Sequence, residues 1–134
     1  MYHCTKIIQM LFLKDLDYLT KKECIHHIWE AIMSMNSYKL NSLLEDNIDY
    51  EDIGKVAFVN KLADRFREDQ THGDHEYKMN IDNCNGCNCN QGVCKFTGIV
   101  SGRTFALFFE FNKNKITDIY HCTWYSDVNS EYPF

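Results

Sequence analysis

The sequence predicts an α+β protein in which N-terminal helices pack on an antiparallel sheet. Apolar residues recur at three- and four-residue spacing before His72, which indicates helices, and they alternate with polar residues after Gly73, which indicates strands. The chain has 134 residues, of which 45% are hydrophobic, and this suits one domain with a single core.

Three helices are predicted in the first half of the chain. The first begins at the capping box Thr20-Lys21-Lys22-Glu23, and its apolar face continues to Met33. The second is short and rich in leucine, and it ends in the acidic segment 45–54. The third follows Gly54 and ends at His72-Gly73-Asp74, a sequence typical of helix ends.

Four strands are predicted in the second half, at residues 75–82, 93–100, 104–111 and 116–125. Consecutive strands joined by short turns favour an antiparallel meander with the helices on one face. Residues 1–19 are expected to form an extra helix outside this plan, which leaves 20–134 as the domain.

The last two strands have a predicted register. A two-residue turn at Lys113-Asn114 would pair Glu110 with Thr117, Phe108 with Ile119 and Ala106 with His121. Because strand side chains alternate, these six side chains would share one face of the sheet. A single β-bulge would reverse this assignment.

The charge and hydropathy of the chain exclude several classes of partner. The net charge is −5, and no basic stripe is present, so neither nucleic acid nor an anionic membrane is expected as a partner. The sequence has no run long enough for a transmembrane helix, and the apolar segment 7–13 lacks a cleavage site. We therefore expect a cytoplasmic protein whose seven cysteines stay mostly reduced.

Four cysteines lie close together around the first predicted hairpin: Cys84, Cys87, Cys89 and Cys94. Three interpretations stay open: a zinc site with four thiolate ligands, a redox-active CxxC pair, or plain reduced thiols. Zinc is the metal expected if the cluster binds one, because the site is small, polar and on a turn. Against a zinc site, Cys89 interrupts the two-arm spacing of strong zinc signatures.

Three segments, 35–54, 56–66 and 108–127, resemble the nuclear-transport-factor-2-like superfamily, which includes ketosteroid isomerases and SnoaL-like polyketide cyclases. The resemblance extends over residues 20–134 and lies in the order of elements, since no single motif is specific. It implies a curved sheet wrapped into a cone with a central apolar pocket. Many members of the superfamily form homodimers through the sheet.

The resemblance also suggests residues for the pocket. Asp52 occupies the position of the general base of ketosteroid isomerases, and His121 lies where relatives often have a polar pocket residue. The oxyanion donors of those enzymes are missing, because the matching positions are Ile28 and Leu107, so isomerase chemistry of that kind is not expected. Side chains expected to contact a small apolar or amphipathic ligand are Trp29, Tyr50, Phe66, Phe108, Glu110 and Ile119.

Simpler interpretations exist for both candidate catalytic residues. Asp52 belongs to an acidic run of the kind that is usually solvated, and His121 would suit a half-buried histidine bonded to the backbone. If the protein is an enzyme, the expected chemistry is acid–base isomerisation, cyclisation or hydrolysis.

The third strand is apolar on nearly both faces, which predicts that each face is covered by another part of a protein. One face can meet the helices, and the other, opposite Tyr120, Cys122 and Trp124, would form an exposed patch in a monomer. Homodimerisation through the sheet follows, unless residues 1–19 cover that face. The alternative function is a non-enzymatic homodimeric interaction module whose cysteine hairpin is a candidate zinc site.

Overall fold

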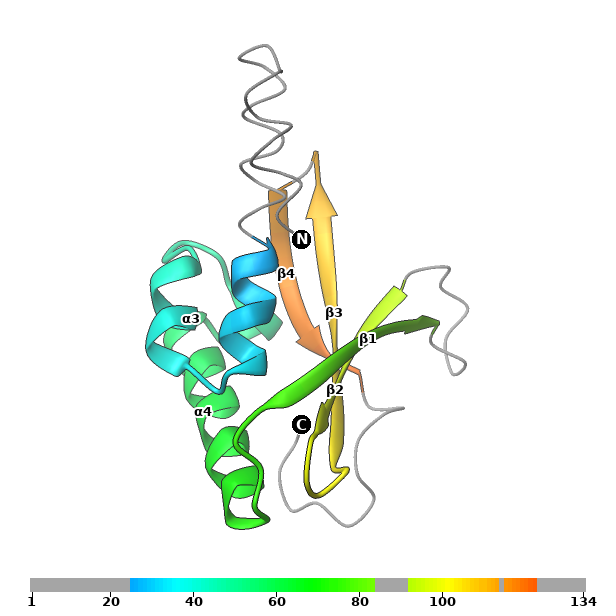
Figure 1. Cartoon of the computed structure of the whole chain (residues 1–134). Coiled ribbons are helices and arrows are strands. Elements are labelled where there is room, and N and C mark those ends of the chain that lie inside the picture. The colour runs from blue at the N-terminus through cyan, green and yellow to red at the C-terminus, as the bar shows by residue number, and fades with distance from the viewer. Residues whose placement is uncertain (1–24, 84–91, 114, 123–134) are drawn as a thin grey trace, which may run out of the picture.

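The structure is a computed structural model that describes residues 25–83, 92–113 and 115–122. Three helices pack against a four-stranded antiparallel sheet, which confirms the predicted α+β class (Figure 1). The predicted capping box at residue 20, the extension 1–19 and most of the cysteine hairpin lie outside the described residues.

The first two helices are joined by a tight turn. The described part of the first helix, 25–33, buries Ile25, Ile28 and Ile32. The turn after it has a left-handed backbone at Met35 (φ 56°), and the Asn36 side chain then accepts a 3.0 Å bond from the Lys39 N–H. This cap starts α3 (Ser37–Leu43).

Helix α4 (Lys55–Thr71) is the long helix of the domain. Its buried apolar residues recur at helical spacing and are Phe58, Val59, Leu62 and Phe66, whereas Val56, in the first turn, is 69% exposed. It ends where the sequence predicts, because Gly73 adopts φ 95° and the Asp74 N–H bonds back to the Asp69 carbonyl.

The sheet has the order β1-β2-β3-β4, a simple meander. The strands are β1 (Tyr77–Asn83), β2 (Gly92–Gly98), β3 (Thr104–Asn112) and β4 (Lys115–His121). Figure 1 shows all the helices on one side of the sheet, and β1 and β2 cross the direction of β3 and β4. The described sheet is twisted and open, with β1 and β4 at its two edges.

The predicted register of the last hairpin is wrong beyond the turn. Asn112 pairs with Lys115 as expected, but a bulge follows, and Glu110 pairs with Asp118 instead of Thr117. The extra residue, Thr117, allows both Ile116 and Ile119 to pack on the core, whereas strict alternation would place them on opposite faces.

The bulge changes which side chains share a face. His121 now lies opposite Leu107, and Ile119 lies opposite Phe109, on the face that packs against the helices. Ala106 and Phe108, which were predicted beside His121, belong to the outer face.

An aromatic cluster lies in the core between the helices and the sheet. Phe96 and Phe105 stack at 5.3 Å, and Tyr77 meets both of these rings edge-on. Phe66 of α4 packs on Tyr77 at 5.9 Å, so this cluster joins the helix layer to three strands.

The expected exposed patch on the outer face is not found at the described residues. Val93, Ala106, Phe108 and Cys122 form a buried cluster there, with Tyr120 packed against it. Phe108 is only 6% exposed in the single chain, so this cluster is not a free surface. Trp124 lies outside the described residues.

The turn between β2 and β3 is fastened to the end of α4 by the buried carboxylate of Asp74. Its Oδ1 accepts the Val100 N–H (2.8 Å) and the Ser101 N–H (2.9 Å), and its Oδ2 accepts the Ser101 hydroxyl. Burial raises the pKa of Asp74, but these bonds outweigh it and hold the pKa below its ordinary value. A Cβ at Gly98 would overlap this carboxylate, so a residue without a side chain is required there.

We predict that Gly98→Ala destabilises the protein by about 2–3 kcal/mol, because the methyl group displaces a fully bonded carboxylate. In an Asp74→Ala background the same change should cost less than about 1 kcal/mol, since the obstacle is gone. Urea unfolding of the four proteins in this cycle measures both costs.

Gly102→Ala is the matched control. Gly102 has φ 75° and open space around it, so its substitution should cost about 1–2 kcal/mol with or without Asp74. An equal cost of Gly98→Ala in both backgrounds would show that the Asp74 carboxylate is not what Gly98 accommodates.

Candidate functional site

A strained turn precedes α4. The short 3-10 helix η1 (Tyr50–Asp52) contains two consecutive left-handed residues, Glu51 (φ 55°) and Asp52 (φ 61°), and Gly54 follows with φ 89°. A left-handed backbone costs an ordinary residue about 1–2 kcal/mol, so something in the fold must hold these two residues in place.

The edge of β4 supplies that restraint. The Glu51 N–H donates to Asp118 Oδ1 (2.8 Å), and Glu51 Oε2 accepts the His121 N–H (2.6 Å). Asp118 Oδ1 also accepts the Ile119 N–H (2.8 Å). Two backbone donors of an edge strand are therefore satisfied by side chains, which prevents a further strand from pairing at these positions.

The same carboxylate binds α4. Lys61 Nζ donates to Glu51 Oε1, and both side chains are mostly buried, with 30% of Lys61 and 17% of Glu51 exposed. Glu51 therefore connects η1, α4 and β4 through one charged group.

His121 is the titratable group at the centre of this cluster. It is half-buried on the helix-facing side of the sheet. Burial lowers the pKa of His121 to about 4; the Glu51 carboxylate opposes this effect, and Lys61 and Arg65 add to it. The imidazole is therefore neutral at physiological pH, with one nitrogen able to donate and the other to accept.

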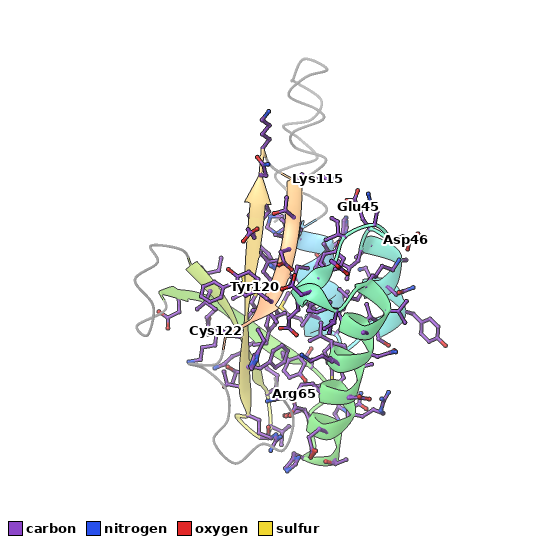
Figure 2. The ribbon with its side chains drawn as sticks, turned by 180° about the vertical axis from the view of Figure 1, so that it is seen from behind. Glu45, Asp46, Arg65, Lys115, Tyr120 and Cys122 are labelled. Atoms are coloured by element: carbon purple, nitrogen blue, oxygen red, sulfur yellow. The ribbon has the colours of Figure 1, made fainter. Side chains whose placement is uncertain are left out.

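A buried ionic network lies beside the cluster and fixes α4. The Asp69 carboxylate accepts bonds from Arg65 Nε (2.7 Å), Arg103 Nε (2.8 Å) and the Tyr77 hydroxyl (2.5 Å). Arg65 and Asp69 are both fully buried, and the Arg65 guanidinium lies 5.1 Å from the centre of the Phe105 ring. Figure 2 shows Arg65 between α4 and the sheet.

The structure brings one of the two predicted catalytic residues into this cluster. His121 belongs to it, whereas Asp52 is exposed on η1, and the backbone directs the neighbouring carboxylate of Glu51 to β4 instead. Among the described residues, no hydrogen bond or ion pair holds the Asp52 side chain beside His121.

The predicted ligand contacts divide between two faces of the sheet. Four of them lie with the core on the helix side: Trp29, Tyr50, Phe66 and Ile119. Phe108 and Glu110 lie on the outer face, where Phe108 is buried and Glu110 is exposed. These six residues therefore do not line one common pocket.

Trp29 differs from the other members of this set because its polar atom, the indole nitrogen, is buried without a hydrogen-bond partner among the described residues. Its ring meets Phe109 edge-on at 6.1 Å, and its buried indole N–H has no hydrogen-bond acceptor among the described residues. The N–H lies beside the Cys94 thiol without forming a hydrogen bond of good geometry.

Cys94 is the only described member of the predicted zinc cluster, since Cys84, Cys87 and Cys89 lie outside the described residues. It lies within β2 opposite Leu107, with its thiol buried in the core. Burial raises the pKa of Cys94 to about 12, so the free thiol is protonated near neutral pH. Among the described residues no other group of histidine, cysteine and carboxylate side chains could hold a metal ion.

Sequence reasoning missed Glu51, Lys61 and Arg65. Glu51 stands in the acidic run that pointed to Asp52, and choosing between neighbours required the backbone angles of η1. Arg65 lies one helical turn after Lys61 and directly before Phe66, so a cation on an otherwise apolar face was the available signal.

The arrangement suits hydrogen bonding better than proton transfer. An efficient general base has a pKa near the working pH, and the pKa of His121 is about 4. A neutral imidazole flanked by an ion pair can orient a polar group without exchanging a proton with it.

Comparison of the chain with family models, with curated proteins and with solved structures found no match in any of the three. Among the described helices, none has the length and apolar character needed to cross a membrane.

We predict that His121 makes the protein less stable in acid. Because its pKa is about 4 in the folded chain and about 6.5 when unfolded, its protonation favours unfolding. The stability that neutral His121 allows is complete above about pH 6.5 and is lost as the pH falls toward about 4. This loss should amount to about 2 kcal/mol after allowance for the half-buried position.

Urea unfolding at a series of pH values measures this effect. His121→Gln should flatten the profile between about pH 6.5 and about pH 4, and His75→Gln, at an exposed histidine, is the matched control. Identical profiles for wild type and His121→Gln would mean that His121 titrates normally in the folded protein.

Proposed function

We propose that the protein binds a small amphipathic molecule at the cluster formed by Glu51, Lys61 and His121. The observation that carries the proposal is the half-buried, neutral His121 beside a mostly buried ion pair. Titratable groups with strongly shifted pKa values are enriched at functional sites, and strained backbone such as that of Glu51 has the same tendency.

The polar end of the ligand would meet the imidazole and the Lys61–Glu51 pair. Its apolar part would meet the edge of the helix-side core at His121, because the neighbouring side chains of Leu107 and Ile119 are themselves fully buried. The indole N–H of Trp29, which has no hydrogen-bond acceptor in the described part of the chain, lies beside Cys94. Cys94, Leu107 and His121 form one cross-strand row. Leu107 lies between Cys94 and His121 in this row and is fully buried, so it separates the Trp29 indole from His121. We assign the ligand to the His121 end of the row.

The proposal includes the cone fold with a central pocket that the resemblance implies. The order of three helices and a four-stranded meander supports the nuclear-transport-factor-2-like resemblance. The aromatic cluster of Phe66, Phe96 and Phe105 argues for a shallow site rather than a deep apolar cavity. Catalysis is not included, because Asp52 is exposed and His121 is a weak base.

The aromatic interior also favours a second candidate function, a non-enzymatic interaction module. A core filled by Phe66 and Phe96 needs no ligand, and the surface would then carry the function. Homodimerisation, zinc binding by the hairpin cysteines and a cytoplasmic location belong to this reading as proposals.

The test uses protein-observed NMR with a panel of small phenols, anilides and aromatic carboxylates as probes. We expect at least one class to shift the ring nitrogen signals of His121. His121→Phe keeps a planar aromatic ring but removes the hydrogen bond, so affinity for that class should fall about fivefold or more.

A pair of variants on α4 provides the control. Lys61→Gln removes the cation beside His121 and should weaken binding, whereas Arg67→Gln removes a cation from an exposed pair with Asp64 and should not. If no probe shifts His121, or if binding is insensitive to both His121→Phe and Lys61→Gln, the proposed site is wrong and the interaction module is favoured.

A further inference from the structure

The two edges of the sheet differ in how they are covered. At β4, the carboxylates of Glu51 and Asp118 take up backbone N–H groups. At the other edge, β1 pairs with β2 and with no second strand in the part of the chain that the structure describes. An edge strand of this kind presents a row of backbone donors and acceptors that a further strand can bind.

The sequence of β1 is complementary to itself in the antiparallel direction. Lys78 and Asp82 lie at equal distances from Asn80, and Met79 and Ile81 lie between them. We infer that β1 pairs with β1 of a second copy of this chain, related by a two-fold axis through Asn80. Each Lys78 then faces an Asp82 of the other copy, and each Met79 faces an Ile81.

Geometry restricts the alternatives to this register. Residues that face each other across a two-fold axis must have their side chains on the same side of the sheet. Because side chains alternate along a strand, the symmetric register must then be centred on a residue, not between two consecutive residues. An axis through Met79 would place Lys78 opposite Asn80, and an axis through Ile81 would place Asn80 opposite Asp82. Among these three registers, only the axis through Asn80 pairs opposite charges.

The two faces of β1 suit this pairing. Lys78, Asn80 and Asp82 are exposed on the outer face, so the ion pairs would form at a solvated surface. Ile81 is on the helix side but is 62% exposed, because it lies beyond the end of the described core. Contact with Met79 of the second copy would cover this side chain, which is otherwise an exposed β-branched residue on an open edge.

A second copy is therefore favoured over an unrelated peptide, since the charges that select the register are both supplied by β1. Seven residues form a small interface, so the dimer should be weak and should depend on protein concentration. Its sheet would continue through eight strands, four from each copy. The pairing uses the edge of β1 and leaves the cluster at His121, on β4, unoccupied.

Sedimentation velocity over protein concentrations from about 1 µM to about 1 mM tests the pairing. Lys78→Glu and Asp82→Lys each replace two attractive pairs by two repulsive ones. Each variant should raise the dimer dissociation constant about tenfold or more. The double variant Lys78→Glu/Asp82→Lys restores opposite charges, and its dissociation constant should return to within about threefold of wild type.

Lys113→Glu is the matched control, because it makes the same charge change at an exposed lysine of the β3–β4 turn. It should leave the dimer unchanged, and circular dichroism should confirm that all variants are folded. Raising the salt concentration should weaken the wild-type dimer, which checks the ion pairs without any substitution.

Two results would overturn the inference. Wild-type protein that remains monomeric over the whole range has no such interface. A dimer that tolerates both single variants, or that the double variant fails to restore, forms through another surface.

Discussion

The buried carboxylate of Asp69 is the constraint on which the arrangement of helices and sheet depends. It accepts bonds from two guanidinium groups and one phenol, so it joins α4 to β1 and to the residue that precedes β3. Burying a charge is costly unless it is paired and hydrogen-bonded, and this network meets both conditions for Asp69. Packing of the aromatic cluster around Phe105 is weakly directional and does not by itself select one rotation of α4 about its axis. The hydrogen bonds of the network are directional, and they fix that rotation.

That rotation determines what His121 meets. Arg65 and Lys61 lie one turn apart on α4, so fixing Arg65 against Asp69 places Lys61 beside Glu51. Glu51 can reach this position only because η1 adopts a left-handed backbone, which the edge of β4 stabilises. The neutral state of His121 thus results from burial and from two cations that the network holds nearby.

The three helices, both ends of α4 and the order of the strands could be predicted from the sequence, because each depends on local spacing and on breakers such as Gly54 and Gly73. The register of the last hairpin could not, because one extra residue at Thr117 serves the packing of Ile116 and Ile119 on a core formed elsewhere. In the site, His121 could be predicted but its carboxylate partner could not. Arg65 and Asp69 have the spacing of an ordinary exposed ion pair on a helix. Their burial involves Arg103, which comes from a distant part of the chain, so their spacing alone could not predict it.

The free energy of unfolding of Asp69→Asn tests the central role of this network most directly. The change keeps the shape but removes the charge that both arginines require, so urea unfolding should show a loss of about 3–5 kcal/mol. Asp64→Asn, in an exposed pair on the same helix, should change stability by less than about 1 kcal/mol. A cost for Asp69→Asn as small as that for Asp64→Asn would contradict the account, because the position of α4 would then rest on apolar packing alone.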